Sequence, residues 1–123
     1  MRLTIISTPI GFLGSGRGGG VELTLNSLVS GLLKQNHFIN VVAPINSKLS
    51  DTCSSANLFA VEGFEQRSWQ HQDYFAQTQN QKGSIVNEML EKALSLIKDC
   101  DAIINLSYDL MPISKTLEID FPI

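Results

Sequence analysis

Four short apolar runs alternate along this chain with two longer segments of helical periodicity, and this alternation limits the possible folds more than any other feature. The apolar runs are rich in β-branched residues and are bounded by proline, glycine or polar residues, as expected of buried strands. They cover residues 3–7, 38–43, 58–61 and 102–106. Strands that alternate with amphipathic helices predict a parallel sheet covered by helices on both faces.

The two helical segments carry apolar residues at positions i, i+3 and i+4, so each is expected to bury one face. The first begins at Val21 and is expected to end at residues 34–36, where an asparagine tolerates the left-handed conformation that often closes a helix. The second follows Ser84, which we expect to be its N-cap. A turn at 109–112 and a short helix over 113–117 are expected near the end of the chain.

The order of these elements predicts an α/β fold with an open, Rossmann-like parallel sheet. The first strand is expected to lie centrally, because the fourth strand follows a long crossover. Ligands of such sheets bind beyond the C-terminal ends of the strands, at the point where the strand order reverses. We therefore expect a binding site between the first and fourth strands, where the loops 9–20 and 107–112 meet.

Composition and charge exclude several classes of function. The chain has 123 residues, which fits one domain, and a net charge of -3 with scattered lysines and arginines. This argues against nucleic acid and against an anionic membrane surface as partners. No apolar run approaches the roughly 20 residues of a membrane-spanning helix, and polar residues interrupt the N-terminal run, so we expect a strand rather than a secretory signal and a cytoplasmic protein. Cys53 and Cys100 lie far apart without nearby metal ligands, which favours two free thiols over a disulfide and predicts no metal site.

The segment GSGRGGG at residues 14–20 places five glycines just before the first helix. Residues 14–19 match the G-x-G-x-x-G pattern of dinucleotide-binding loops. However, six residues separate this segment from the first strand, and no acidic residue ends the second strand, which argues against bound NAD or FAD. The segment also lacks the Lys-Ser/Thr pair of a phosphate-binding Walker loop. No role is assigned to its first two glycines.

The last three glycines leave the first amides of the helix uncovered by side chains, and the helix dipole favours an anion at such a position. The residues expected to face that anion are Arg17, Gly18, Gly19 and Gly20. Glu22 lies in the first turn, where an acidic side chain complements the dipole and need not be catalytic. The alternative is a glycine-rich connector that packs a strand against a helix and binds no ligand.

Two further motifs accompany this glycine segment: GGVE at residues 19–22, followed by the amphipathic helix, and NHFINVVAP at residues 36–44. Together they resemble the beginning of family-4 retaining glycosyltransferases of the GT-B fold. That family usually has glycine where this sequence has Asn36. The runs STPIGFLGSGRGGGVELTLNSL at 7–28 and NLSYDLMP at 105–112 are also similar to UDP-glucose:tetrahydrobiopterin glucosyltransferases, a subgroup of the family.

The resemblance implies two Rossmann-like domains that face a cleft, with the nucleotide sugar held by the C-terminal domain and the acceptor by the N-terminal one. Residues 1–123 would then be an incomplete N-terminal, acceptor-side domain, and the C-terminal domain with its glutamate pair is absent from this sequence. The full-length protein is expected to be a retaining hexosyltransferase that uses UDP-glucose as donor substrate and no tightly bound cofactor. Tetrahydrobiopterin is the candidate acceptor, and the chain alone is expected to be inactive.

Within this resemblance, the glycines before the helix would lie beside the donor diphosphate. Tyr108 and Asp109 follow the fourth strand and are candidates to contact the acceptor, by stacking and by hydrogen bonding. The alternative is a tyrosine at the rim of the sheet and an aspartate that forms a turn. No catalytic residue is assigned to this chain. His37 is expected to be structural, and the aromatic cluster around His71 in residues 64–83 is interpreted as local packing or as an acceptor lid.

Two other functions remain open on the sequence. A self-sufficient nucleotide-binding Rossmann domain would share the fold, although the missing acidic residue after the second strand argues against it. A non-enzymatic interaction module is the other alternative, because an incomplete sheet leaves apolar surface that favours pairing with a second copy.

Overall fold

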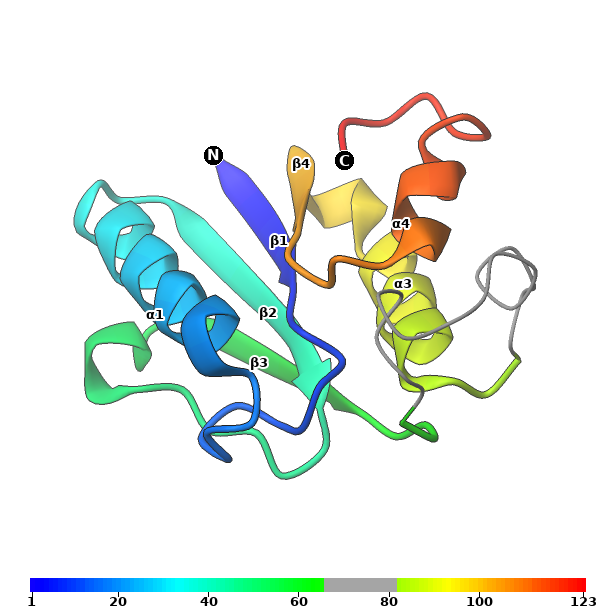
Figure 1. Ribbon diagram of the computed structural model, residues 1–123. Helices are drawn as coiled ribbons and strands as arrows, with labels where there is room; N and C mark the ends of the chain where they lie inside the picture. Colours follow the sequence, from blue (N-terminus) through cyan, green and yellow to red (C-terminus); the bar gives the residue numbers. More distant parts are fainter. Residues whose placement is uncertain (66–81) are drawn as a thin grey trace.

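The computed structural model describes residues 1–65 and 82–123 and contains one sheet of four parallel strands (Figure 1). The strands are β1 (Arg2–Ile6), β2 (Phe38–Pro44), β3 (Asn57–Val61) and β4 (Ala102–Asn105). Their order in the sheet is β3-β2-β1-β4, so that β1 pairs with both β2 and β4. The predicted α/β fold, an open parallel sheet with the first strand inside it, is confirmed.

Helices cover both faces of this sheet. Figure 1 shows α1 on one side of the strands and α3, with α4 beside it, on the other. The α-helices are α1 (Gly19–Lys34), α3 (Ile85–Ser95) and α4 (Leu110–Lys115), and single turns of 3₁₀ helix form η1 (Asp51–Cys53) and η3 (Ile97–Asp99). None of the helices within the described ranges is long and apolar enough to cross a membrane.

The core consists of two apolar layers that share the strands. Successive side chains of a strand point to opposite faces, so Ile5 packs in the layer beneath α1 and Ile6 in the layer beneath α3. Leu25 of α1 and Met89 of α3 are fully buried in these two layers. Burial of such a side chain contributes about 1.5–3 kcal/mol relative to leaving it in water. Both helices are therefore held by the same two central strands.

Local signals place the ends of the two long helices. Helix α1 begins at Gly19, two residues before the expected start at Val21. At its C-terminal end Asn36 has φ 63°, the left-handed conformation that the sequence predicts there. Ser84 is the N-cap of α3, as predicted, and its hydroxyl accepts a hydrogen bond from the backbone N–H of Asn87 at 3.2 Å.

The predicted short helix near the end of the chain is present, but its predicted bounds are wrong. Instead of a turn followed by a helix over 113–117, helix α4 spans Leu110–Lys115. The cause is Asp109, whose Oδ1 accepts a hydrogen bond from the backbone N–H of Met111 at 3.0 Å and so caps the helix. Pro112 falls in the first turn, where a missing N–H is tolerated.

Candidate functional site

All four strands are parallel, so their C-terminal ends and the loops that follow them meet at one edge of the sheet (Figure 1). The loop after β1 leads into α1, and the segment after β4 leads into α4. The strand order reverses between β1 and β4, as predicted, which is where open α/β sheets bind ligands. The candidate site is therefore built from the loops at this edge.

The glycine-containing loop after β1 is anchored to the loop after β2. Leu13 is buried in the core layer beneath α1. Its backbone N–H donates to the Ser47 hydroxyl at 2.9 Å, and its carbonyl accepts from the Lys48 N–H at 2.9 Å. A buried side chain and two hydrogen bonds thus fix the middle of the loop. The sequence of residues 8–13, which precede the first glycine of the segment, shows no apparent periodicity that would indicate this anchor.

The first two glycines of the segment, which the sequence left without a role, shape this loop. Gly14 has φ 97° and Gly16 has φ 78°, and side chains disfavour both conformations. The backbone N–H of Gly14 donates to Glu22 Oε1 at 2.6 Å. Glu22 therefore ties the turn back onto the first turn of α1, in addition to complementing the dipole of that helix.

The start of α1 is bare, but its three glycines differ from one another. Gly18 packs closely, because a Cβ there would lie 2.8 Å from Thr8 Cγ2. Gly19 has φ 54°, and its N–H donates to the Gly16 carbonyl at 3.3 Å. Gly20 has an ordinary φ, and outside its own stretch of helix no described atom comes within 4 Å of a Cβ built on it. No side chain of the described residues caps the helix, so its exposed face lies at Gly19 and Gly20.

The carboxylate of Glu22 modifies the electrostatics of this helix start. Its Oε2 atom is buried and finds no hydrogen-bond partner among the described residues. A Cβ on Gly18 would lie 3.5 Å from the same atom. A negative charge here opposes the binding of an anion beside Gly14 and Gly18.

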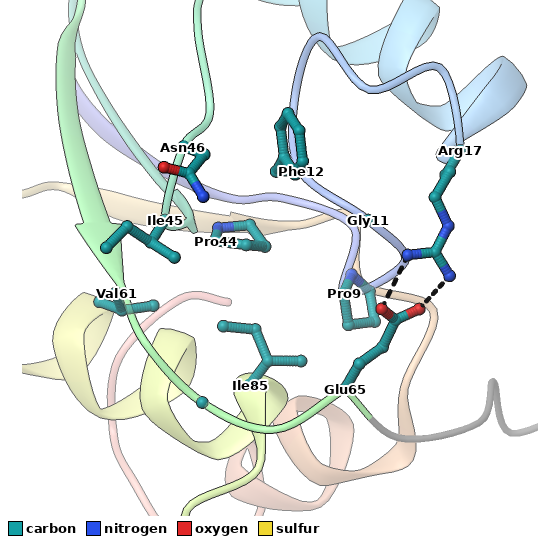
Figure 2. Close-up of a pocket in the computed structure, with 11 residues that line it drawn as sticks. Pro9, Gly11, Phe12, Arg17, Pro44, Ile45, Asn46, Val61, Glu65 and Ile85 are labelled. Carbon is teal, nitrogen blue, oxygen red and sulfur yellow. Dashed lines mark hydrogen bonds and ion pairs between the residues drawn. The ribbon is translucent and has the colours of Figure 1, made fainter.

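Arg17 does not carry the unpaired charge that the sequence suggested. Its guanidinium makes a bidentate ion pair with Glu65, with Nη1 2.9 Å from Oε2 and Nη2 2.6 Å from Oε1 (Figure 2). Glu65 follows β3, so the pair joins the loop after β1 to the segment after β3. The two side chains remain 59% and 41% exposed, which leaves the pair open to competition by solvent and by ligands.

The two residues expected to contact the acceptor have different surroundings. Tyr108 has φ 54° and is 63% exposed, so its ring is accessible at the rim after β4. Asp109 is only 7% exposed, and its carboxylate caps α4. A chain of hydrogen bonds supports this turn, from the Asp109 N–H to Ser107 Oγ and from Ser107 Oγ to Asn105 Oδ1. Asp109 caps α4, and acceptor contact by Tyr108 or by Asp109 stays a prediction.

A hollow of about 180 Å³ lies at the same edge, over the ends of β1, β2 and β3 (Figure 2). Its lining consists of Pro9, Gly11, Phe12, Arg17, Pro44, Ile45, Asn46, Val61, Gly63, Glu65 and Ile85. Tyr108 and Asp109 are not part of it. Of the residues singled out from the sequence, only Arg17 lines the hollow, where it joins three residues that the sequence analysis missed: Phe12, Asn46 and Glu65. No motif marks them, because only the fold brings their three loops together.

Several other residues lie away from this site. The N-terminal amino group of Met1 is 2.9 Å from His37 Nδ1, at the opposite edge of the sheet, which agrees with a structural role for that histidine. Cys53 and Cys100 are buried free thiols, as predicted. The cluster around His71 lies outside the described residues. Residues 1–65 and 82–123 contain no group of three or more His, Cys, Asp or Glu side chains that could hold a metal ion.

The chain matches no protein-family model and no curated protein.

Proposed function

We propose that this chain is the acceptor-side part of a retaining, UDP-sugar-dependent glycosyltransferase. The reaction would transfer glucose from UDP-glucose to a small acceptor such as tetrahydrobiopterin, in a cytoplasmic enzyme. The resemblance of the GGVE and NHFINVVAP segments supports this proposal. The observation that carries it is the bare start of α1, at the edge of the sheet where open α/β folds bind ligands.

In this reaction, negative charge develops on the diphosphate as it leaves the sugar. Backbone N–H groups fixed beforehand at a helix start stabilise such charge without reorganisation. The Gly19 N–H already donates to the Gly16 carbonyl and the Val21 N–H to the Gly18 carbonyl, so Gly20 presents the available amide of this helix start. Glu22 holds the adjoining turn in place through Gly14. Arg17 keeps its ion pair with Glu65 in this proposal, so backbone amides rather than its guanidinium would face the diphosphate.

The donor sugar itself is assigned to a second domain, and the acceptor to the loops of this one. In the complete enzyme the acceptor hydroxyl would arrive on the face of the sugar that UDP leaves, which retains the configuration of the reacting carbon.

Substitution of Gly20 by valine in the complete natural protein tests the role of the helix start. A branched side chain at this position would cover the Gly20 N–H, and outside its own stretch of helix no described atom lies within 4 Å of its Cβ. We expect kcat with UDP-glucose and tetrahydrobiopterin to fall by about 10²-fold, the usual loss when one preorganised donor is removed. Steady-state kinetics and circular dichroism would separate this loss from a loss of folding.

Gly31→Val provides the matched control. Gly31 is also an exposed glycine of α1, and outside its own stretch of helix no described atom lies within 4 Å of a built Cβ. It lies far along the helix from the loop edge. Its variant should retain normal turnover. Gly19 and Gly18 are poorer choices, since Gly19 has a positive φ and Gly18 packs against Thr8. Equal activity of the Gly20→Val and Gly31→Val enzymes would refute the assignment.

A further inference from the structure

The hollow over β1, β2 and β3 has the size of one small ring. Its volume of about 180 Å³ is close to the roughly 150 Å³ of an apolar cavity known to hold benzene. It is smaller than the roughly 300 Å³ at which pockets for drug-sized ligands begin. One six-membered ring with a few substituents would therefore fill it.

The walls of the hollow are apolar in the middle and polar at two ends. Figure 2 shows Pro44 and Ile85 between the Asn46 amide on one side and the ion pair of Arg17 with Glu65 on the other. The ring of Phe12 borders the same space from the loop after β1. This arrangement suits a ligand that has an apolar face and hydrogen-bonding groups around its rim.

The polar ends favour a ligand without net charge. Arg17 and Glu65 neutralise each other, so a charged ligand would find no unpaired opposite charge in the hollow. Their pairing uses two of the five guanidinium N–H groups and leaves further carboxylate lone pairs, so the pair can still accept and donate hydrogen bonds. The Asn46 amide also has both a donor and an acceptor.

The backbone around Asn46 is fixed before any ligand binds. Asn46 has φ 71°, and it lies in a turn closed by a hydrogen bond from the Ser47 N–H to the Pro44 carbonyl at 3.2 Å. The preceding residue, Ile45, donates its N–H to the Val61 carbonyl at 2.8 Å. A preformed wall of this kind lowers the ordering cost of binding.

We propose that this hollow binds one neutral ring with an apolar face and a hydrogen-bonding rim. A flat heterocycle and a pyranose sugar share this chemistry. The binding site stands without glycosyl transfer, and it rests on the proposed function only in that the bound ring would then be the acceptor. Phe12, Asn46 and the ion pair of Arg17 with Glu65 would in that case determine acceptor specificity.

The test is a titration of the isotope-labelled 123-residue chain, without any donor, with biopterin and separately with methyl α-glucoside. Binding of either probe, followed by NMR, should shift the signals of the Asn46 amide and of the Phe12 ring. A response to biopterin identifies the heterocycle as the ring, and a response to the glucoside identifies the sugar. No shift with either probe up to millimolar concentration, or shifts centred on Tyr108, would overturn the proposal.

Two asparagine substitutions make the test specific. Asn46→Gly removes the amide but keeps a residue that readily adopts the positive φ, so the turn should persist. We expect it to weaken binding of the responding probe about fivefold, the effect of losing one hydrogen bond. Asn36→Gly is the matched control, because Asn36 also has a positive φ but ends α1 away from the hollow. Equal affinities for the two variants would contradict a role for Asn46. No donor is present in this titration, so a negative result would count against the binding site and not against the role of Gly20 in glycosyl transfer.

Discussion

At the scale of single residues, Asp101 and Arg2 hold the beginnings of β4 and β1 together. The backbone N–H of Arg2 donates to Asp101 Oδ2 at 2.7 Å, and the Asp101 N–H donates to the Arg2 carbonyl at 2.7 Å. The Arg2 guanidinium lies 3.3 Å from Asp101 Oδ1. The backbone hydrogen bond from Arg2, and after it the hydrogen bond from the Arg2 side chain, lower the pKa of Asp101 below its ordinary value.

Replacement of Asp101 by asparagine should make the stability of the protein less sensitive to acid. A carboxyl group whose pKa is lower in the folded state stabilises the fold above its unfolded pKa of about 3.9. That stabilisation disappears as the pH falls through the folded pKa. Urea unfolding at a series of pH values from 7 to 2 would measure it. The gap in unfolding free energy between the natural protein and Asp101→Asn should narrow as the pH falls, and a constant gap would contradict this account.

At the scale of elements, the sequence predicts the strands and the two long helices because their apolar periodicity comes from burial itself. It fails at α4, where a cap at Asp109 starts the helix earlier than the apolar pattern indicates. It also fails to predict the partners in the site. The pairs Gly14 with Glu22, Leu13 with Ser47, and Arg17 with Glu65 depend on how three loops meet in space. No local rule specifies such contacts between distant segments.

The junction between β3 and α3 explains why one glycine of this region should not tolerate a side chain. A Cβ on Gly63 would lie 2.8 Å from both the N and the Cα atoms of Ile85, and 2.9 Å from the Gly83 carbonyl oxygen. These are backbone atoms, so they cannot move aside as a flexible side chain can. The neighbouring Phe64 is hydrogen-bonded through both of its backbone groups. Its N–H donates to the Gly83 carbonyl, and its carbonyl accepts from the Ile85 N–H. The absence of a side chain at Gly63 therefore allows the end of β3 and the start of α3 to lie this close together.

Alanine substitutions at Gly63 and Gly31 should change stability in opposite directions. Gly63→Ala forces the backbones apart and should lower the free energy of unfolding by about 1–3 kcal/mol, as overpacking does. Gly31→Ala places a methyl group in open space within α1 and should raise it by about 0.5–1 kcal/mol, because alanine loses less entropy in a helix. Chemical denaturation of both variants measures the difference. A change of the same sign in both would show that the approach at Gly63 is not a constraint.

At the scale of the whole molecule, one pair of strands supports both halves of the core. β1 and β2 each contribute side chains to the layer beneath α1 and to the layer beneath α3, such as Ile5 and Ile6 of β1. Loss of either helix would expose one face of the same strands to water. The two layers should consequently unfold together rather than one after the other.

Alanine substitutions of one buried residue in each layer test this coupling. Leu25 beneath α1 and Met89 beneath α3 are both fully buried, so either change should lower the free energy of unfolding by about 2–5 kcal/mol. Thermal unfolding of each variant should remain a single transition at a lower Tm, with far-ultraviolet and near-ultraviolet circular dichroism changing together. Leu23→Ala is the control, because Leu23 belongs to α1 but is 71% exposed and should change stability by less than about 0.5 kcal/mol. Two separate transitions in the Leu25→Ala or the Met89→Ala protein would mean that the faces of the sheet fold independently.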